Sequence, residues 1–316
     1  MRGIARILHI YGPQAFQEQP LLNAFEAARS FMIVGALVGK QRLFFDSEQW
    51  RSIPWAKHPV YKTPQSELLD ILVVVPGILQ DHAALEATQV SQHSPYREIL
   101  DRVKTQITIL YQWRWKWQKR SAHEVGTQAS SVASASDSSE RLRFRRFVAA
   151  SEIMLYNAVL MWLMALLYKM DPLGASQQIE AYANAAIPQN DDAARYASFQ
   201  PLRRPGAAFT LRDPAIEICK AFEWVTRHHA YSKEPTFLYL FPVGMAMTAL
   251  KDDPQAMAWV RALLNTSPAT ASYAQGENQA GFGFYLSRES MLAPELVQAT
   301  EPWLLFSQQD VVQLRA

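Results

Sequence analysis

The chain has 316 residues, of which 49% are hydrophobic and 19% are charged, and its formal net charge is +2. This balance excludes a globally disordered chain, because there is ample apolar material for a buried core. The charge does not by itself indicate a polyanion partner, and the lone cysteine excludes an internal disulfide framework and a cysteine-only metal cluster.

The first long predicted element is a helix within residues 19–41, where apolar residues recur at helical spacing. Pro20 suits its first turn and Gly39 suits its end. The stripe expected to face the core consists of Leu22, Phe25, Arg29, Met32, Ile33, Ala36 and Leu37.

Two further helices are predicted in this part of the chain. A short one begins at Asp46 or Ser47, either of which can cap it, and stops at Pro54. An apolar run over residues 66–80 follows, with Ser66 as its expected cap and a break at Pro76-Gly77.

The stretch YQWRWKWQKR, residues 111–120, mixes tryptophans with basic residues, so it could contact nucleic acid, lie on a membrane or end a packed helix. A helical stripe favours the packed helix, with Trp115 alone pointing elsewhere and Arg114, Lys116 and Lys119 facing solvent. That stripe consists of Ile99, Val103, Ile107, Leu110, Trp113 and Trp117.

Residues 121–140 are rich in serine and poor in large apolar side chains, so we expect a disordered internal loop. The loop separates a first helical block, residues 1–120, from a second, residues 141–316. We expect the two blocks to pack together as one large multi-helix domain.

Residues 153–168 contain no charged side chain, and a bilayer-spanning helix needs about 20 apolar residues. Because the run is shorter and is bounded by Glu152 and Lys169, we favour a central helix packed on all sides over a membrane span.

The second block shows two helix starts, at Asp213-Pro214 and Asp253-Pro254, in which aspartate would cap and proline would occupy the first position. The aromatic run between them favours a helix bent near Pro242. Alternating polar and apolar residues of strands are missing from the sequence, which predicts an all-α fold.

A search for catalytic patterns finds little. The histidines lack metal-ligand spacing, and Cys219 lies in an apolar helical pattern, which favours an inert core thiol. The pairs Asp191-Asp192 and Asp252-Asp253 resemble the magnesium-binding carboxylates of all-α terpene cyclases, but each lacks a further carboxylate one turn on. We therefore predict no metal, no cofactor and no enzymatic activity.

Motifs spread along nearly the whole chain resemble the regulatory region of fungal binuclear zinc-cluster transcription factors. The resemblance rests on their order and spacing rather than on any single motif. The matching positions are Gly12-Pro13, Arg29, Leu37, Phe44-Phe45, Glu48, Trp50, Pro54-Trp55, Ile218, Cys219, Glu223, Trp224, residues 240–246, Trp259 and residues 281–287.

The resemblance implies a nuclear transcriptional regulator, with the cytoplasm as a second location, that controls metabolic genes such as a secondary-metabolism cluster. It also implies a small-molecule effector and a protein partner, either a zinc-cluster factor or a second copy. The packed-helix interpretation of residues 153–168 predicts no membrane. The family's six-cysteine DNA-binding cluster cannot form from one cysteine, so we expect no specific DNA binding by this chain alone. The alternative is an all-α enzyme or binding protein with an apolar cavity for an isoprenoid or lipid-like molecule.

Basic residues cluster in the middle of the chain. Residues 102–146 hold ten Lys or Arg and three Asp or Glu, a net +7 against −5 for the remainder. Two groups within this stretch resemble a loosely spaced bipartite nuclear import signal, and a solvated helix end with a linker is an equal alternative. The residues are Lys116, Lys119, Arg120, Arg141, Arg143, Arg145 and Arg146.

Overall fold

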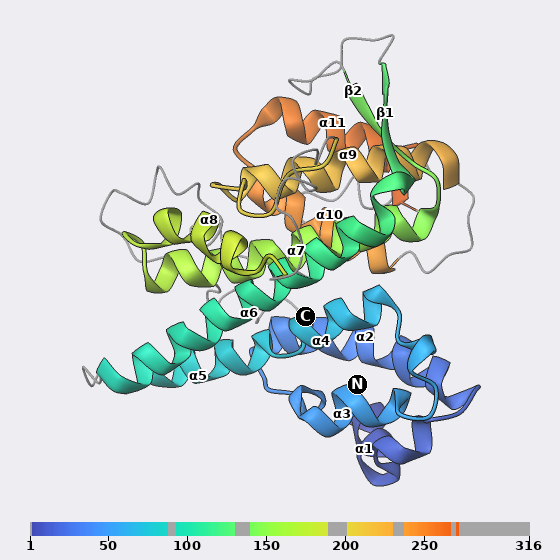
Figure 1. Ribbon diagram of the computed structural model, residues 1–316, viewed down its shortest axis with the longest axis vertical. Helices are drawn as coiled ribbons and strands as arrows, with labels where there is room; N and C mark the ends of the chain where they lie inside the picture. The colour runs from blue at the N-terminus through green and yellow to red at the C-terminus, as the bar shows by residue number, and fades with distance from the viewer. Residues whose placement is uncertain are drawn as a thin grey trace. The chain divides into compact units, whose positions relative to one another are not determined.

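The computed structural model describes residues 2–87, 93–129, 140–188, 201–229, 237–266 and 270–271. Most of these residues are helical, so the predicted all-α class is confirmed (Figure 1). The chain divides into two compact units, residues 1–106 and 107–316, and the division falls within the helix α6 (His93–Ser121) rather than at the loop where two blocks were expected to meet.

The first unit is built from short helices around α2. Its α-helices are α1 (Arg2–Tyr11), α2 (Leu21–Gly39), α3 (Glu48–Ser52), α4 (Pro64–Leu72), α5 (Val75–Ala87) and the first half of α6. Single 3-10 turns connect them: η1 (Pro13–Phe16), η2 (Phe44–Asp46), η3 (Ile53–Trp55) and η4 (Pro59–Tyr61).

Helix α2 follows its sequence pattern closely. All seven residues of the predicted stripe are buried, including the charged Arg29. The helix ends at Gly39, and Lys40 follows in the left-handed conformation, with its N–H directed to the carbonyls of Ala36 and Leu37. The predicted stripe and end of this helix are confirmed, whereas Pro20, expected in its first turn, lies one residue before it at the N-cap position.

The cap of α4 differs from the prediction. Thr63, not Ser66, is the N-cap, and its hydroxyl accepts a hydrogen bond from the Ser66 N–H at 3.1 Å. Pro64 occupies the first helical position, where a missing N–H costs nothing. Ser66 instead lies inside the helix and donates its own hydroxyl proton to Glu26 at 2.6 Å.

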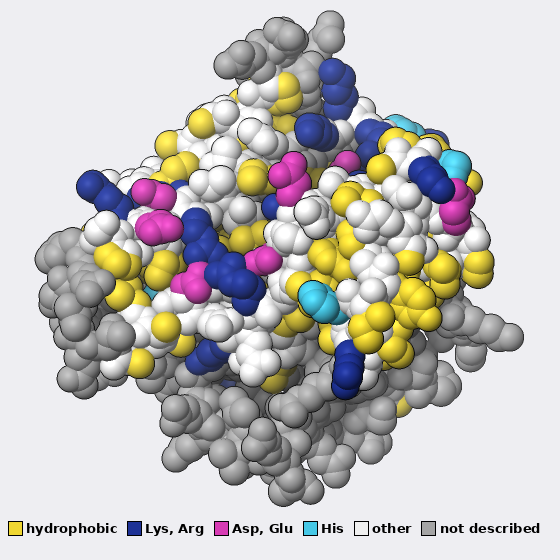
Figure 2. Space-filling view, turned by 90° about the horizontal axis from the view of Figure 1, so that it is seen from below, with side chains coloured by type: hydrophobic (Ala, Val, Ile, Leu, Met, Phe, Trp, Pro, Cys, Tyr) yellow, Lys and Arg dark blue, Asp and Glu magenta, His cyan; other side chains and the backbone are white. Residues whose placement is uncertain are grey.

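Helix α1 presents an apolar face to solvent. Ile4, Ile7, Ile10 and Tyr11 are half to two-thirds exposed, whereas Leu8, one turn from Ile4, is buried. Figure 2 shows hydrophobic side chains gathered on the side of the first unit seen from below. Leu8, together with His9, whose ring lies 5.3 Å from that of Phe44, attaches α1 to its unit.

The second unit has α7 at its centre, packed against α9 and α10 (Figure 1). Helix α11 lies on α9, and α8 follows α7. Its elements are the second half of α6, η5 (Ala122–Glu124), β1 (Val125–Ala129), β2 (Glu140–Phe144), α7 (Phe147–Met170), α8 (Ala175–Ala185), α9 (Arg212–His229), α10 (Phe237–Ala249) and α11 (Pro254–Leu264).

Every residue of α7 from Ala149 to Tyr168 is buried in the fold, as expected of a helix packed on all sides. Three stretches of the described chain, Leu21–Gly39, Pro64–Ala87 and Phe147–Met170, have the length and hydropathy that would suffice to cross a membrane. The apolar window of the last is wholly buried, so packing within the unit accounts for its composition.

The prediction of a disordered loop over residues 121–140 is wrong at both ends. Residues 125–129 and 140–144 form an antiparallel hairpin, in which Val125 pairs with Phe144 and Ala129 with Glu140. Buried Leu142 and Phe144 anchor the second strand against α9, and this tertiary burial overrides the polar composition of the stretch. Residues 130–139 lie outside the described part.

One of the two predicted aspartate caps is confirmed. The Asp253 carboxylate accepts the Ala256 N–H at 2.9 Å, with Pro254 at the first position of α11. Asp213 lies inside α9 instead, and its carboxylate accepts from the N–H groups of Phe209 and Thr210 in the preceding turn. The apolar run around Pro242 is helical, as expected.

Candidate functional site

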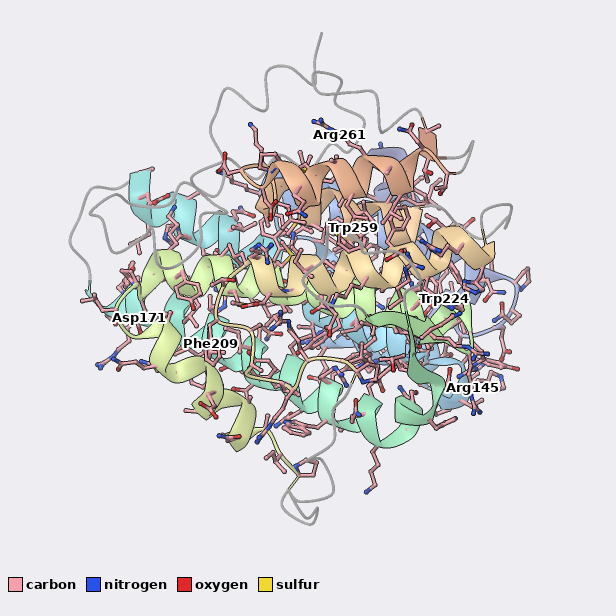
Figure 3. All side chains as sticks on the ribbon, turned by 90° about the horizontal axis from the view of Figure 1, so that it is seen from above. Arg145, Asp171, Phe209, Trp224, Trp259 and Arg261 are labelled. Carbon is pink, nitrogen blue, oxygen red and sulfur yellow. The ribbon has the colours of Figure 1, made fainter. Side chains whose placement is uncertain are left out.

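A pocket of about 240 Å³ opens in the second unit between the hairpin and α9. Figure 3 shows its wall residue Trp224 at the same end of the unit as Arg145, and Asp171 and Phe209 at the other end. The pocket is lined by Gln128, Arg141, Leu142, Lys220, Glu223, Trp224, Arg227 and His228.

Helical spacing brings five of these side chains to one face of α9. Positions 220, 223, 224, 227 and 228 are three or four residues apart, so their side chains lie above one another. Ile218, Phe222 and Val225 on the other side of the helix are buried in the core. The hairpin closes the pocket with Gln128 and Arg141, which are directly paired across the two strands.

Positive charge exceeds negative charge around the pocket. Arg141, Lys220 and Arg227 face the single carboxylate of Glu223. Glu223 Oε1 accepts a hydrogen bond from Arg227 Nη2 at 2.8 Å and lies 3.0 Å from Arg141 Nε. The second contact is an ion pair without hydrogen-bond alignment, and no acceptor among the described residues is aligned with the buried Arg141 Nε–H.

Aromatic rings form the other wall. The His228 ring stacks on Trp224 with centroids 4.9 Å apart, and Phe144 meets Trp224 edge-on at 5.5 Å. His228 Nδ1 lies 2.9 Å from the Trp224 carbonyl oxygen. Because a carbonyl can only accept, Nδ1 carries the proton of this bond, and the ring is held in one orientation.

The structure thus brings together two residues that the sequence had placed in separate groups, Arg141 of the basic cluster and Glu223 of the motif positions. Lys220, Arg227 and His228 were not predicted to belong to a site. Their spacing of three and four residues on one helix face was visible in the sequence, but the strand that completes the pocket was not.

The motif positions of the first unit form an aromatic core instead of a pocket. Trp50 packs against Phe25 at 5.6 Å between ring centroids and against Phe45 at 5.4 Å. Pro54 and Trp55 are buried beside them, and Glu48 is exposed at the start of α3. Gly12 adopts φ 69°, a conformation that glycine tolerates best, and places buried Pro13 at the start of η1.

Arg29 is the charged member of that core. Its guanidinium is fully buried, pairs with Asp70 and lies 5.3 Å from the Trp55 ring centroid. Lys62 approaches the same two partners, at 2.6 Å from Asp70 and 4.7 Å from the Trp55 centroid. These contacts connect α2, η3 and α4, which is a structural role.

Glu26 in the same layer gives a pH-dependent contribution to stability. Its Oε1 accepts from Trp55 Nε1 at 3.1 Å and from Ser66 Oγ. Burial raises the pKa of Glu26 above its ordinary value of 4.5, although these hydrogen bonds and Arg29 lower it. The folded state then binds the proton more tightly than the unfolded state, so stability falls as pH rises from 4.5 through the raised pKa.

We expect Glu26→Gln to become more stable relative to the parent as pH rises between about 4 and 7, measured by urea midpoints. Glu18→Gln is the control. The pKa of exposed Glu18 is lowered from 4.5, first by its hydrogen bond from Lys57, so any contribution is complete above pH 4.5 and the variant should show no trend with pH from there to about 7. A pH-independent difference between the Glu26 variant and the parent would contradict the expectation.

The tryptophan-rich end of α6 is packed, as predicted, but more completely than predicted. Trp115 and Arg114, expected to face away from the core, are fully buried together with Trp117. Trp115 Nε1 donates to the Ala183 carbonyl at 3.0 Å, and the Arg114 guanidinium lies 4.9 Å from the Trp117 centroid and 5.7 Å from that of Tyr156. Trp115 is therefore not available to stack on a nucleic acid base.

The basic residues of the predicted import signal have different environments. Lys116, Lys119 and Arg120 are exposed on α6, and Arg143 and Arg145 are exposed on and just after β2. Arg146 pairs with the buried Glu124, and Arg141 lines the pocket. The nuclear import signal itself stays a prediction.

Cys219 is fully buried on α9, and burial raises the pKa of its thiol. Because the thiolate is the nucleophile, we expect a disulfide-exchange reagent to label native protein several orders of magnitude more slowly than urea-unfolded protein. The unfolded chain, which has one cysteine, should take up one equivalent. Immediate stoichiometric labelling of folded protein would show that the thiol is accessible.

Among the described residues no group of three or more His, Cys, Asp or Glu side chains is placed to hold a metal ion. Asp191 and Asp192, and the motif at residues 281–287, lie outside the described part. Asp253 is used as a helix cap and pairs with Arg212 at 2.9 Å. Comparison with family models, curated proteins and solved structures finds no match to this chain.

Proposed function

We propose that the chain is a non-catalytic regulatory module of the kind found in fungal zinc-cluster transcription factors, without a zinc cluster of its own. In this proposal it acts in the nucleus, controls metabolic genes such as a secondary-metabolism cluster, and responds to a small-molecule effector. Its helical units bind a zinc-cluster factor or a second copy, and it needs no membrane, metal or cofactor.

One observation supports the proposal: several of the motif positions lie together in a mostly helical chain. Pro13, Arg29, Trp50 and Trp55 contribute to one buried core. Glu223, a motif position in the second unit, lies in a pocket. A module with motif residues in its core and a recessed polar pocket suits binding and regulation better than turnover.

The pocket also favours this proposal over an all-α enzyme for isoprenoid or lipid-like molecules. Such substrates require an extensive apolar cavity, and four of the eight residues that line the pocket are Arg, Lys or Glu. A hydrocarbon chain would gain little from these side chains and would strip them of water.

The central test tethers the chain to an unrelated sequence-specific DNA-binding domain above a reporter gene in a fungal host. We expect reporter expression to change at least several-fold relative to the DNA-binding domain alone, in either direction. The matched control is the same fusion carrying Glu217→Ala, which should accumulate poorly because its fold is damaged. An unchanged reporter, with the parent fusion intact in the nucleus, would refute the proposal.

A second test concerns DNA. Sequence-specific reading requires a rigid element that places several side chains on base edges. The basic residues of the predicted import signal are spread over α6 and β2 in different environments. At about 150 mM salt, near physiological ionic strength, we expect the purified protein to enrich no motif from a promoter library. Enrichment of one motif at least about a thousandfold above random DNA would contradict this.

A further inference from the structure

We propose that the pocket between the hairpin and α9 binds a compact organic anion that carries a carboxylate or phosphate group. The binding itself is inferred from the geometry of the pocket. Its role as the effector site of the module rests on the proposed function.

The charges of the pocket are the first argument. Glu223 is the one acidic side chain in the lining, and the cationic Arg141 and Arg227 lie beside it. Glu223 interacts with both arginines through a single oxygen, so one carboxylate is shared between two guanidinium groups. A bound anion would be attracted to these arginines in a recess where screening by water is reduced.

The geometry of Arg141 is the second argument. Its side chain is 20% exposed and is fixed by the ion pair with Glu223, yet its Nε–H has no aligned acceptor among the described residues. A guanidinium presents several N–H groups in one plane, which match the two oxygens of a carboxylate or phosphate. The ion pair holds this guanidinium in the pocket wall, so an entering oxyanion would meet an oriented group, through nitrogens other than the buried Nε.

Size and shape restrict the ligand further. The volume of about 240 Å³ is below the roughly 300–1,000 Å³ typical of sites for drug-sized molecules. Leu142 and the stacked pair of Trp224 and His228 provide apolar and aromatic wall. This combination suits a small organic acid or phosphorylated metabolite with an apolar or planar body, in which the body contacts the rings and the anionic group contacts the arginines.

The same features disfavour a nucleic acid backbone as the ligand. An extended polyanion would need a continuous basic groove, whereas here the cations surround a recess with a carboxylate inside it. Glu223 would repel neighbouring phosphates that a compact anion does not have. DNA binding is therefore an alternative outcome of the experiment.

The experiment titrates the full chain by calorimetry and thermal unfolding with benzoate, citrate, acetate and inorganic phosphate, with chloride at equal ionic strength as the reference. We expect saturable binding of benzoate or citrate, with a Kd of about 1 mM or tighter, and weaker binding of acetate and phosphate, which lack an organic body. Stronger binding of phosphate than of every organic anion would overturn the assignment of the ligand class.

Variants test the assigned residues. Arg141→Gln and Arg227→Gln should each weaken binding at least tenfold, whereas Arg143→Gln, an exposed position on the same strand outside the pocket, should leave it unchanged. Glu223→Gln should tighten binding several-fold because it removes the competing carboxylate. Damage to the structure would weaken binding, so an increase in affinity distinguishes a ligand-binding role of Glu223 from a structural one. Circular dichroism of each variant checks that it is folded.

The proposal is overturned if no anion binds saturably, or if Arg143→Gln weakens binding as much as Arg141→Gln. It is also overturned if the parent protein binds duplex DNA but no small anion, and the Arg141 variant no longer binds the DNA. Should Glu223→Gln fail to fold, Lys220→Gln gives the remaining test, with weaker binding expected. Anion binding without an effect of tethered protein on a reporter would refute the proposed function and leave this inference standing.

Discussion

Replacing Arg29 by alanine should destabilise the first unit by about 3–5 kcal/mol, the usual effect of removing one partner of a buried ion pair. Arg29 is fully buried and its partner Asp70 is 16% exposed, so the carboxylate would keep Lys62 but lose the guanidinium that lies deepest in the core. The substitution also empties the space over the Trp55 ring, which adds a cavity term.

Arg29→Met should cost less than Arg29→Ala, because methionine refills most of the volume. Arg29 also has two nitrogens, Nε and Nη1, with no aligned acceptor among the described residues, so its own burial is already unfavourable. The double change Arg29→Met with Asp70→Asn should therefore recover part of the loss, since it leaves no uncompensated carboxylate.

Hydrogen exchange of peptides from α2 and α4 measures this effect in the first unit alone, and urea unfolding measures it in the whole chain. Lys57→Ala is the control, because Lys57 and its partner Glu18 are both more than half exposed and such pairs often contribute nothing measurable. An Arg29→Ala variant as stable as the Lys57 variant would show that the buried pair does not hold the unit together.

Replacing Glu217 by alanine should have a similar effect in the second unit, about 3–5 kcal/mol. Glu217 is buried on α9 and accepts from Asn157 Nδ2 at 2.9 Å and from the Arg203 N–H at 2.7 Å. It also stabilises the charge of buried Arg114. Burial lowers the pKa of Arg114, and the nearby Tyr156 and Glu217 raise it again in part. Alanine removes both acceptors and the compensating charge together.

Glu217→Gln removes the charge and one of the two acceptor oxygens but keeps the other, so it is a milder change than alanine. We expect its stability to lie between those of the parent and of Glu217→Ala, measured by urea unfolding and by exchange in peptides of α7 and α9. Glu180→Ala, an exposed position on α8, is the control and should be neutral. Equal stability of Glu217→Gln and the parent would show that Arg114 does not depend on this carboxylate.

Local patterns predicted much of the helical structure. The stripe of α2, the aspartate cap of α11 and the packing of α7 follow from spacing and capping within one segment, so they could be derived without tertiary information. The cap of α4 was missed because Thr63 and Ser66 are both good caps, and the choice depends on Pro64 taking the first position.

Contacts between distant segments could not be predicted. Periodicity assigns one buried face to a helix, but α6 is covered on more than one side, so Trp115 reaches the Ala183 carbonyl. Arg114 is tolerated in the core because aromatic rings of Trp117 and Tyr156 and the carboxylate of Glu217, far along the chain, surround it. The candidate pocket depends in the same way on a strand meeting α9, and composition had assigned that strand to a loop.

The base of the hairpin is closed twice, because Glu124 pairs with Arg146 through its side chain and accepts the Arg145 N–H at its carbonyl at 2.9 Å. The contacts that hold the two strands to the unit therefore do not depend on the number of residues between the strands. Each doubling of loop length adds only about 0.6 kcal/mol to the cost of loop closure, so an epitope tag or protease site inserted between Ala129 and Glu140 should leave folding intact. The hairpin thus offers a place to label or cut the chain while the helices around α7 stay assembled.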